Sequence, residues 1–457
     1  MKKQSKQKRA KKNHVKRFPV INPNASGIDV SDKEMVVAFP PENDGSQLTE
    51  TFESFTRDLH RISALLKEHG VTTVAMESTG VYWVHLFTLL QEEGFEVYLV
   101  NAKHVKNVTG RKNDESDAQW IQKLHSCGLL NNSFQPDEMT RTLRSLVRHR
   151  KMLVRSSSDY INRMQKSLEL MNIKVHTVIR DILGKTGTAI IEAIIAGERD
   201  AEVLADMADP RIKATRETMV KSLEGHWRFE HIFCLTQAYE NYLFHRQQIE
   251  KCDKEIENHL KTMAAKLANS NERAVEKEEK KTKIKRKRTT NKTKLQFNAT
   301  FYLQKLSGVD VTEINGISEI SALEIFSETG FDMSHWPGHK QFTSWLGFAP
   351  NNKISGGKLI SSKIMKKKHP AGQAFRMAVI SLFKSQTPLG DRLRRIKARS
   401  GPGVAIVATA RSMAVCFYQM VRKQEAFDPS KLEIGQEKFR QYKIKRLEKQ
   451  LAALKAA

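Results

Sequence analysis

The chain has 457 residues, 39% of them hydrophobic, so it is long enough for two or three folded domains. Lysine and arginine number 77 against 51 acidic residues, and the net charge of +26 indicates a polyanionic partner such as nucleic acid. We see no run of about 18 apolar residues and no apolar signal segment, which argues against a membrane protein and favours a soluble cytoplasmic one. The cysteines are far apart, so neither a CxxC metal site nor a disulfide scaffold is predicted.

The first part of the chain predicts an α/β domain behind a basic arm. Residues 1–18 are rich in lysine and arginine and are expected to be a disordered arm that seeks nucleic acid. Within residues 19–138, the pattern predicts a β-hairpin, a strand, a helix, a strand, a helix and a strand, in this order. The two helices are expected within Thr56–His69 and Val81–Glu93. This succession predicts a sheet with helices packed on it.

Residues 139–275 predict a helical connector. One long helix is expected from about Met139 to Leu170. A second helical region has apolar residues spaced by three or four, with charges between them: Ile249, Cys252, Ile256, Leu260, Met263 and Leu267. This spacing suits an amphipathic helix or a short coiled coil, and a core helix in a bundle fits about equally well.

The last third of the chain predicts a basic linker followed by a mostly helical domain. Residues 276–300 are expected to be a linker that can lie along phosphates, with a merely solvated tether as the alternative. A compact domain is predicted over residues 301–425, and a charged helix or tail over residues 426–457. Within the domain, Glu313–Gly330 is typical of a helix-hairpin-helix, whose turn amides approach a phosphate, although many other helical hairpins also carry a glycine.

Four acidic residues form a candidate metal site in the first domain. Asp29 is expected on the first strand and Glu77 at the end of a later strand, while Asp114 and Asp117 are expected on one face of the following helix. A charge inside the apolar strand GIDV is costly unless something pairs with it. Carboxylates are hard oxygen ligands suited to Mg²⁺ or Mn²⁺, and paired ions of that kind stabilise in-line displacement at phosphorus. Acids in this order characterise ribonuclease-H-like nuclease folds.

A second candidate site is the segment NNKISGGKL, Asn351–Leu359, which presents one hydroxyl between two lysines. Taken alone, the segment predicts an exposed, flexible turn, because Ser-Gly pairs mark loops far more often than active sites. Ser361 and Ser362 lie close enough in sequence to be rival nucleophiles.

Several motifs together resemble one family. They are GIDVS, AMESTGVYW, GRKNDESDAQWI, INGISEISALEIFSETG and FTSWLGFAPNNKISGGK. In order and spacing they resemble the Asp-Glu-Asp-Asp transposases of the insertion sequence 110 family, which are similar to Piv DNA invertases. The resemblance covers most of Gly27–Met420. It implies a RuvC-like, ribonuclease-H-like N-terminal domain, a helical coiled-coil connector and a mostly helical C-terminal transposase domain.

The resemblance also implies roles for individual residues. Asp29, Glu77, Asp114 and Asp117 would be catalytic and hold the metal, and Ser355 would attack DNA to form a 5′-phosphoserine intermediate. The glycines behind Ser355 would let a phosphodiester approach closely, and the flanking lysines would stabilise the added charge. The residues expected to contact nucleic acid are Arg111, Lys112, Lys353, Gly356, Gly357, Lys358, Lys366, Lys367 and Lys368.

The implied partners are double-stranded donor and target DNA and a noncoding bridge RNA that pairs with both. Recombination of two duplexes predicts a homo-oligomer, from dimer to tetramer. The implied location is the prokaryotic cytoplasm, at the nucleoid. Two alternatives stay open: a metal-dependent RuvC-like junction resolvase in which Ser355 is only a loop residue, and a noncatalytic nucleic-acid-binding protein.

Overall fold

The chain forms two compact units, Met1–Gln135 and Pro136–Ala457. The computed structural model describes residues 19–42, 45–101, 105, 116–270, 294–364 and 369–430, together with residues 441, 444, 445, 448 and 452. The predicted arm over residues 1–18 and most of the predicted basic linker lie outside the described residues. The first boundary predicted from the sequence, at residue 138, falls close to the boundary between the two units.

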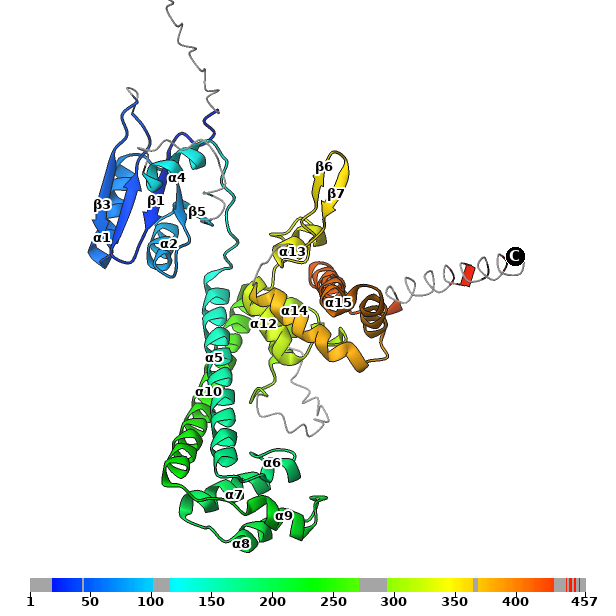
Figure 1. The fold of residues 1–457 in the computed structure, drawn as a ribbon. Coiled ribbons are helices and arrows are strands. Elements are labelled where there is room, and N and C mark those ends of the chain that lie inside the picture. Colours follow the sequence, from blue (N-terminus) through cyan, green and yellow to red (C-terminus); the bar gives the residue numbers. More distant parts are fainter. Residues whose placement is uncertain are drawn as a thin grey trace, which may run out of the picture. The chain divides into compact units, whose positions relative to one another are not determined.

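The first unit is a five-stranded mixed sheet with helices packed on both faces (Figure 1). Its elements are β1 (Ala25–Val30), β2 (Glu34–Ala38), β3 (Thr49–Glu53), α1 (Thr56–Glu68), β4 (Thr73–Glu77), α2 (Trp83–Glu92), β5 (Glu96–Val100) and α4 (Asp117–Ser126). The strand order is β3-β2-β1-β4-β5, with β1 antiparallel to β2 and parallel to β4. The predicted α/β class and the predicted succession of strands and helices are confirmed.

Alternation along the strands gives the two faces of this sheet different partners. Ile28 and Met76 are register partners, and both point into a core that also contains side chains from α1 and α2. The residues between the core positions belong to the opposite face, where Ala75 and Val100 pack with Trp120 of α4. The sheet is therefore covered by α1 and α2 on one side and by α4 on the other.

Helix α4 is held tightly against β1 and β4. A side-chain nitrogen of Gln122 donates a hydrogen bond to the carbonyl of Ala25 at 3.1 Å. Three residues further along the helix, a ring nitrogen of His125 lies 2.8 Å from the hydroxyl of Thr73, and burial lowers the pKa of His125 to about 4. The imidazole is therefore neutral at pH 7, and this pair costs no buried charge.

Gly27 sets the approach of α4 to β1. A Cβ at this position would lie 2.4 Å from the carbonyl oxygen of Ala118 and 2.2 Å from the backbone nitrogen of Gln122. We expect Gly27→Ala to destabilise the first unit by about 1–3 kcal/mol, because backbone must move to make room. Urea unfolding of the variant measures this. Ala38→Gly on β2 is the control, because it changes one methyl group in the same sheet without a clash. Gly94→Ala would not serve, because Gly94 has a φ of 91° and alanine would be strained there.

The second unit is almost entirely helical. Its first group of elements is α5 (Glu138–Leu170), α6 (Val175–Val178), α7 (Lys185–Ala196), α8 (Ala201–Asp206), α9 (Arg216–Leu223) and α10 (Phe229–Ser270). Its second group is α11 (Ala299–Ser307), the 3₁₀ turn Val311–Glu313, α12 (Glu319–Thr329), α13 (His339–Trp345), β6 (Lys353–Ser355), β7 (Lys358–Ser361), α14 (Pro370–Ile380), the 3₁₀ turn Ser381–Lys384 and α15 (Pro388–Lys423). The predicted mostly helical C-terminal region is confirmed.

Helices α5 and α10 lie side by side as an antiparallel pair (Figure 1). A ring nitrogen of His259 lies 2.7 Å from the carbonyl of Met139, near the start of α5. Further along α5, Arg150 forms a buried ion pair with Asp253, and both side chains are almost fully enclosed. The amphipathic helix predicted from Ile249 onward therefore packs against α5 of the same chain.

Helix α12 docks on the same long helix α5. The guanidinium of Arg148 donates two hydrogen bonds, of 2.7 and 2.9 Å, to the buried carboxylate of Glu328. Arg144, one turn earlier, donates to the carbonyl of Glu328 at 2.9 Å. The connector and the C-terminal region, predicted to be separate domains, thus share one compact unit.

Aromatic rings form the core of the C-terminal region. Phe417 of α15 lies at its centre, with its ring centroid 5.1 Å from that of Phe326, 5.6 Å from that of Phe375 and 6.2 Å from that of Phe342. All four rings are fully buried. They come from α12, α13, α14 and α15, so this cluster ties the four helices together.

The turn before α12 uses its glycine for packing. Gly316 has a φ of 98°, and a Cβ there would lie 2.8 Å from the carbonyl oxygen of Ala378 on α14. Ser318 caps α12 by accepting a hydrogen bond from the amide of Ser321. The glycine in the predicted helix-hairpin-helix is thus required by the close approach of α14, which is a structural reason independent of phosphate binding.

Helix α15 bears on the expectation that the chain has no membrane-spanning segment. Among the helices that the structure describes, it alone has the length and hydropathy of a membrane span. Half of that apolar window is buried inside the protein, and Gly401, with a φ of 81°, interrupts the helix. Because Met413 and Phe417 pack in the core, we interpret α15 as a core helix of the second unit.

Candidate active site

Asp29 and Glu77 lie next to each other in the sheet. Ile28 of β1 and Met76 of β4 are partners in the parallel register, and each acid is the next residue along its strand. Adjacent residues in a parallel register point to the same face, about 4.8 Å apart across the sheet. Ile28 and Met76 face α1 and α2, so both carboxylates belong to the face covered by α4. Both side chains are partly exposed.

A third predicted acid, Asp117, is the first residue of α4. Ser116 caps the helix: its hydroxyl accepts from the amide of Gln119 at 3.2 Å, and the side chain of Gln119 accepts from the amide of Ser116 at 3.0 Å. This capping box fixes Asp117 as the first helical residue. The next residue, Ala118, is the one whose carbonyl oxygen approaches Gly27, two residues before Asp29 on β1.

The capping box also corrects one expectation. Because Ser116 has extended backbone angles and α4 begins at Asp117, the argument that Asp114 and Asp117 share a helical face does not apply. Asp114 itself lies outside the described residues. The same is true of five residues predicted to contact nucleic acid: Arg111, Lys112, Lys366, Lys367 and Lys368.

The described carboxylates fit a divalent ion in chemistry and in their placement on two neighbouring strands. Glu77 also accepts a hydrogen bond from the hydroxyl of Thr79 at 2.9 Å. Within the described part of the chain, however, no group of three or more His, Cys, Asp or Glu side chains converges closely enough to hold a metal. The described residues therefore bring two predicted ligands into adjacent register, with Asp117 at the start of the helix covering the same face.

The serine segment is a β-hairpin rather than an irregular loop. Strands β6 and β7 are antiparallel and are joined by Gly356 and Gly357, whose φ angles are 53° and 73°. Positive φ at both positions is the requirement of a two-residue type I′ turn, which glycine meets without strain. A Cβ at either glycine would meet nothing within 4 Å, so the backbone at the tip is open to an approaching ligand.

The register of the hairpin gives its two faces different chemistry. Ser355 pairs with Lys358, and Ile354 pairs with Leu359. Directly opposite residues share a face of the ribbon, with Cβ atoms about 4.5–5.5 Å apart. One face therefore carries the hydroxyl beside an ammonium group. The other carries Ile354 and Leu359, which are 66% and 58% exposed.

Lys353 takes a different place in the ribbon. It pairs with Ser361 across a register shift between Lys353 and Ile354. The two lysines that flank Ser355 in sequence are thus not equivalent in structure. A Gly-Gly pair between two short strand-like segments is a known hairpin signal, and the inequivalence of the two lysines could have been predicted from it.

The hydroxyl of Ser355 is accessible. The residue is exposed, and the structure contains no hydrogen bond between this hydroxyl and any other described residue. Paired carboxylates on neighbouring parallel strands and a hydroxyl presented beside a lysine are both features of enzymes that act on phosphodiester bonds. The two features lie in different units, and each fits nucleic-acid strand cleavage.

Comparison with known protein families also indicates an enzyme that acts on phosphodiester bonds of nucleic acid. Residues 26–173 match a family model described as "Transposase", for the DEDD domain of IS110 elements. Residues 310–389 match a model described as "Transposase IS116/IS110/IS902 family". No match to a curated protein was found. The chain belongs to the IS110 family of transposases.

Membership of this family establishes the general activity. The protein is a DNA transposase of an insertion sequence, and DNA is its substrate. Its DEDD domain indicates that it depends on a divalent metal ion. The first matched region spans the whole sheet and α4, and the second spans α12, α13, the serine hairpin and α14.

Proposed function

We propose that this transposase cuts and rejoins DNA through a covalent 5′-phosphoserine intermediate formed on Ser355. The observation that carries the proposal is the geometry of the hairpin. It holds an exposed hydroxyl opposite Lys358 and directly before a turn without side chains. A phosphodiester can therefore reach the hydroxyl without a steric barrier from the tip.

The step balances as a displacement at phosphorus. The Oγ atom of Ser355 forms a bond to phosphorus, and the bond from phosphorus to the 3′ oxygen of the neighbouring nucleotide breaks. The hydroxyl proton leaves to a base, and the released 3′ oxygen takes up a proton. Attack by a 3′ hydroxyl of another strand reverses these changes and frees the serine, so strands are exchanged without net hydrolysis.

We propose that Lys358 acts directly on this step, because it shares a ribbon face with Ser355. Its ammonium group would stabilise the charge that develops on the phosphoryl oxygens. We expect Lys358→Ala to lower the rate of adduct formation at saturating DNA by about 10²-fold. Lys353→Ala is the matched control and should lower that rate much less. Equal losses in the two variants would instead indicate a general effect of positive charge on DNA binding.

Asp29, Glu77, Asp117 and Asp114 are the proposed ligands of the divalent ion, Mg²⁺ or Mn²⁺. When bound, such an ion supplies Lewis-acid stabilisation at phosphorus. The strand order β3-β2-β1-β4-β5, with acids at the ends of β1 and β4, supports a RuvC-like, ribonuclease-H-like assignment for the first unit. Catalysis by the whole protein then requires the carboxylates and Ser355 to meet at one DNA strand, within a chain or between protomers.

We also propose a noncoding bridge RNA as the guide, with pairing supplying sequence choice while the protein binds backbone and shape. The net charge of +26 supports two nucleic-acid partners, and a homo-oligomer would bring two duplexes together. Sequencing of RNA that copurifies with the protein tests this. A single transcript complementary to both element ends is expected, and random cellular RNA would contradict it.

The serine mechanism is tested by locating the covalent bond. The protein is incubated with a nicked DNA substrate that traps the adduct, digested with nuclease and trypsin, and examined by mass spectrometry. Trypsin places Ser355 in the peptide ISGGK and the rival serines, Ser361 and Ser362, in LISSK. We expect the nucleotide mass on ISGGK. A nucleotide on LISSK, or cleaved DNA with no adduct, would contradict the proposal.

A further inference from the structure

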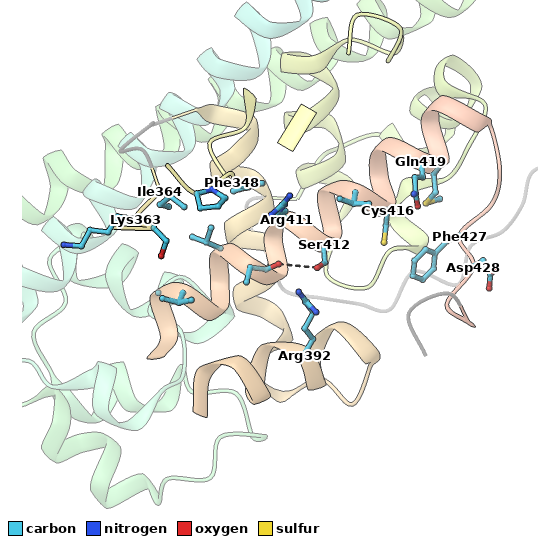
Figure 2. Close-up of a pocket in the computed structure, with 18 of the residues that line it drawn as sticks. Phe348, Lys363, Ile364, Arg392, Arg411, Ser412, Cys416, Gln419, Phe427 and Asp428 are labelled. Atoms are coloured by element: carbon cyan, nitrogen blue, oxygen red, sulfur yellow. Dashed lines mark hydrogen bonds between the residues drawn. The ribbon is translucent and has the colours of Figure 1, made fainter. Parts of the chain in front are cut away.

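A groove runs along the second half of α15, beside the base of the serine hairpin. Its volume is about 960 Å³, which places it at the upper end of the usual range for ligand sites, about 300–1,000 Å³. Figure 2 shows Lys363 and Ile364 at one end, Phe427 and Asp428 at the other, and Arg411 and Cys416 between them. The bridge between Pro350 and Ile364 and the hydrogen bond from the amide of Asn351 to Lys363 connect this end of the groove to the hairpin.

Two arginines, Arg392 and Arg411, border the groove. The Nε atom of Arg392 is buried and has no hydrogen-bond partner among the described residues. Its side chain extends from the first half of α15 toward Ser412 on the second half (Figure 2). Within the described part of the chain, neither Arg392 nor Arg411 has a salt-bridge partner, whereas the nearby Arg394 pairs with Asp391. A buried guanidinium donor without an acceptor is costly, so an anionic ligand would relieve this cost.

The groove wall between these cations is apolar. Val404, Val407 and Val415 of α15 line it, and Val404 is 56% exposed. Two aromatic rings, Phe348 and Phe427, also contribute. The kink at Gly401 separates this wall from the arginine-rich first half of α15, so apolar and cationic surfaces face one space.

We propose that this groove binds a single-stranded segment of nucleic acid, with its phosphates at Lys363, Arg392 and Arg411 and its bases against the apolar wall. Single strands expose their base faces, whereas a duplex keeps them stacked inside. The acids of the lining, Glu425 and Asp428, follow α15 in sequence, and Figure 2 shows Asp428 at the end away from Lys363. The phosphates are therefore expected toward the hairpin end.

This inference extends the proposed function, since strands must separate before they are exchanged. The groove would hold the unpaired part of a strand that is handled at the adjoining hairpin. Binding of a single strand in the groove requires no covalent step at Ser355. The test below therefore uses Ser355→Ala protein, and its failure would leave the serine mechanism intact.

The native cysteines provide a footprint of the groove. Cys416 lines it, while Cys234 is exposed on α10 and outside it. Burial raises the pKa of the Cys416 thiol, so alkylation is followed at about pH 8.5–9, at or slightly above the usual thiol pKa. A 12-nucleotide single-stranded DNA is added at a concentration that saturates the groove. We expect it to slow alkylation of Cys416 at least about fivefold and to leave alkylation of Cys234 unchanged. Unchanged alkylation of Cys416 at saturating DNA would overturn the proposal.

Variants separate the groove from general charge effects. Arg392→Gln and Arg411→Gln should each reduce the slope of log affinity against log salt by about 0.7 for the same oligonucleotide. Arg399→Gln, an exposed arginine outside the groove on the same helix, should change it less. Val404→Asp is placed at an exposed wall position, so the protein should fold, and it should abolish protection of Cys416.

Protection of Cys416 by other ligands shows which class of molecule the groove binds. A matched DNA duplex should protect Cys416 more weakly than the single strand. Equal protection by the duplex would overturn the single-strand assignment. Equal protection by heparin or by an acidic peptide of the same charge would overturn the assignment to nucleic acid, because neither offers bases to the apolar wall.

Discussion

Ser355→Ala is expected to abolish the covalent protein–DNA adduct and to lower strand exchange by at least about 10³-fold. The variant removes the proposed attacking oxygen and nothing that holds the hairpin together. The residue is exposed, its hydroxyl makes no hydrogen bond to another described residue, and the turn depends on the two glycines behind it. DNA affinity should therefore be unchanged. Adduct formation on a nicked substrate and DNA affinity by fluorescence anisotropy measure the two quantities separately.

The neighbouring serines are the matched controls for this prediction. Ser361→Ala and Ser362→Ala alter the same segment, and both proteins should still form the adduct. Ser361 accepts a hydrogen bond from the amide of Lys363 at 3.3 Å, so a small structural effect is expected there. If Ser355→Ala still cuts DNA at the normal rate, the metal-dependent resolvase becomes the better assignment. If all three variants bind DNA but none forms an adduct, the hairpin as a whole and not one hydroxyl is required.

Asp253→Asn is expected to destabilise the second unit by about 3–5 kcal/mol, the usual effect of removing one member of a buried ion pair. Arg150 and Asp253 are both almost fully buried between α5 and α10, so the variant leaves a guanidinium without its counter-charge. Asp253 also accepts a hydrogen bond from the amide of Gln296 at 3.2 Å, which joins the start of the C-terminal region to α10. Urea unfolding monitored by the helical circular dichroism signal measures the loss.

Two further variants show whether the buried charge is responsible. Glu217→Gln breaks an exposed pair with Lys221 and should leave the unfolding midpoint unchanged. A double variant, Arg150→Met with Asp253→Leu, should recover most of the lost stability, because apolar residues of similar volume can replace a buried ion pair. A double variant as unstable as Asp253→Asn would mean that the pair is needed for its geometry rather than for charge compensation.

Local sequence patterns were sufficient to predict the elements of the first unit. Strand-like segments bounded by turn residues and three-to-four spacing in the first helix predicted the succession from β1 to β5. They also placed Asp29 on the first strand and Glu77 at the end of a later strand. The adjacency of these two acids comes from the parallel pairing of β1 with β4, which joins residues far apart in sequence and leaves no local pattern.

The errors have similar physical causes. A spacing of three suggested one helical face for Asp114 and Asp117, but the Ser116 capping box starts the helix between them. The composition of the serine segment predicts a flexible turn, because glycine and serine are common in loops, whereas the structure pairs β6 with β7. Neither the ion pair of Arg150 with Asp253 nor the groove on α15 could be predicted, since each depends on how distant helices meet.

The exposed apolar side of the hairpin bears on when the serine can react with DNA. A hydroxyl able to attack DNA is a hazard if it reacts at every backbone it meets. Ile354 and Leu359 are left in water, and covering them is worth roughly 2–4 kcal/mol. A two-stranded ribbon is also marginally stable by itself. We expect that the nucleophile is firmly aligned only when an assembled complex covers that side, so that protein outside such a complex does not cut DNA.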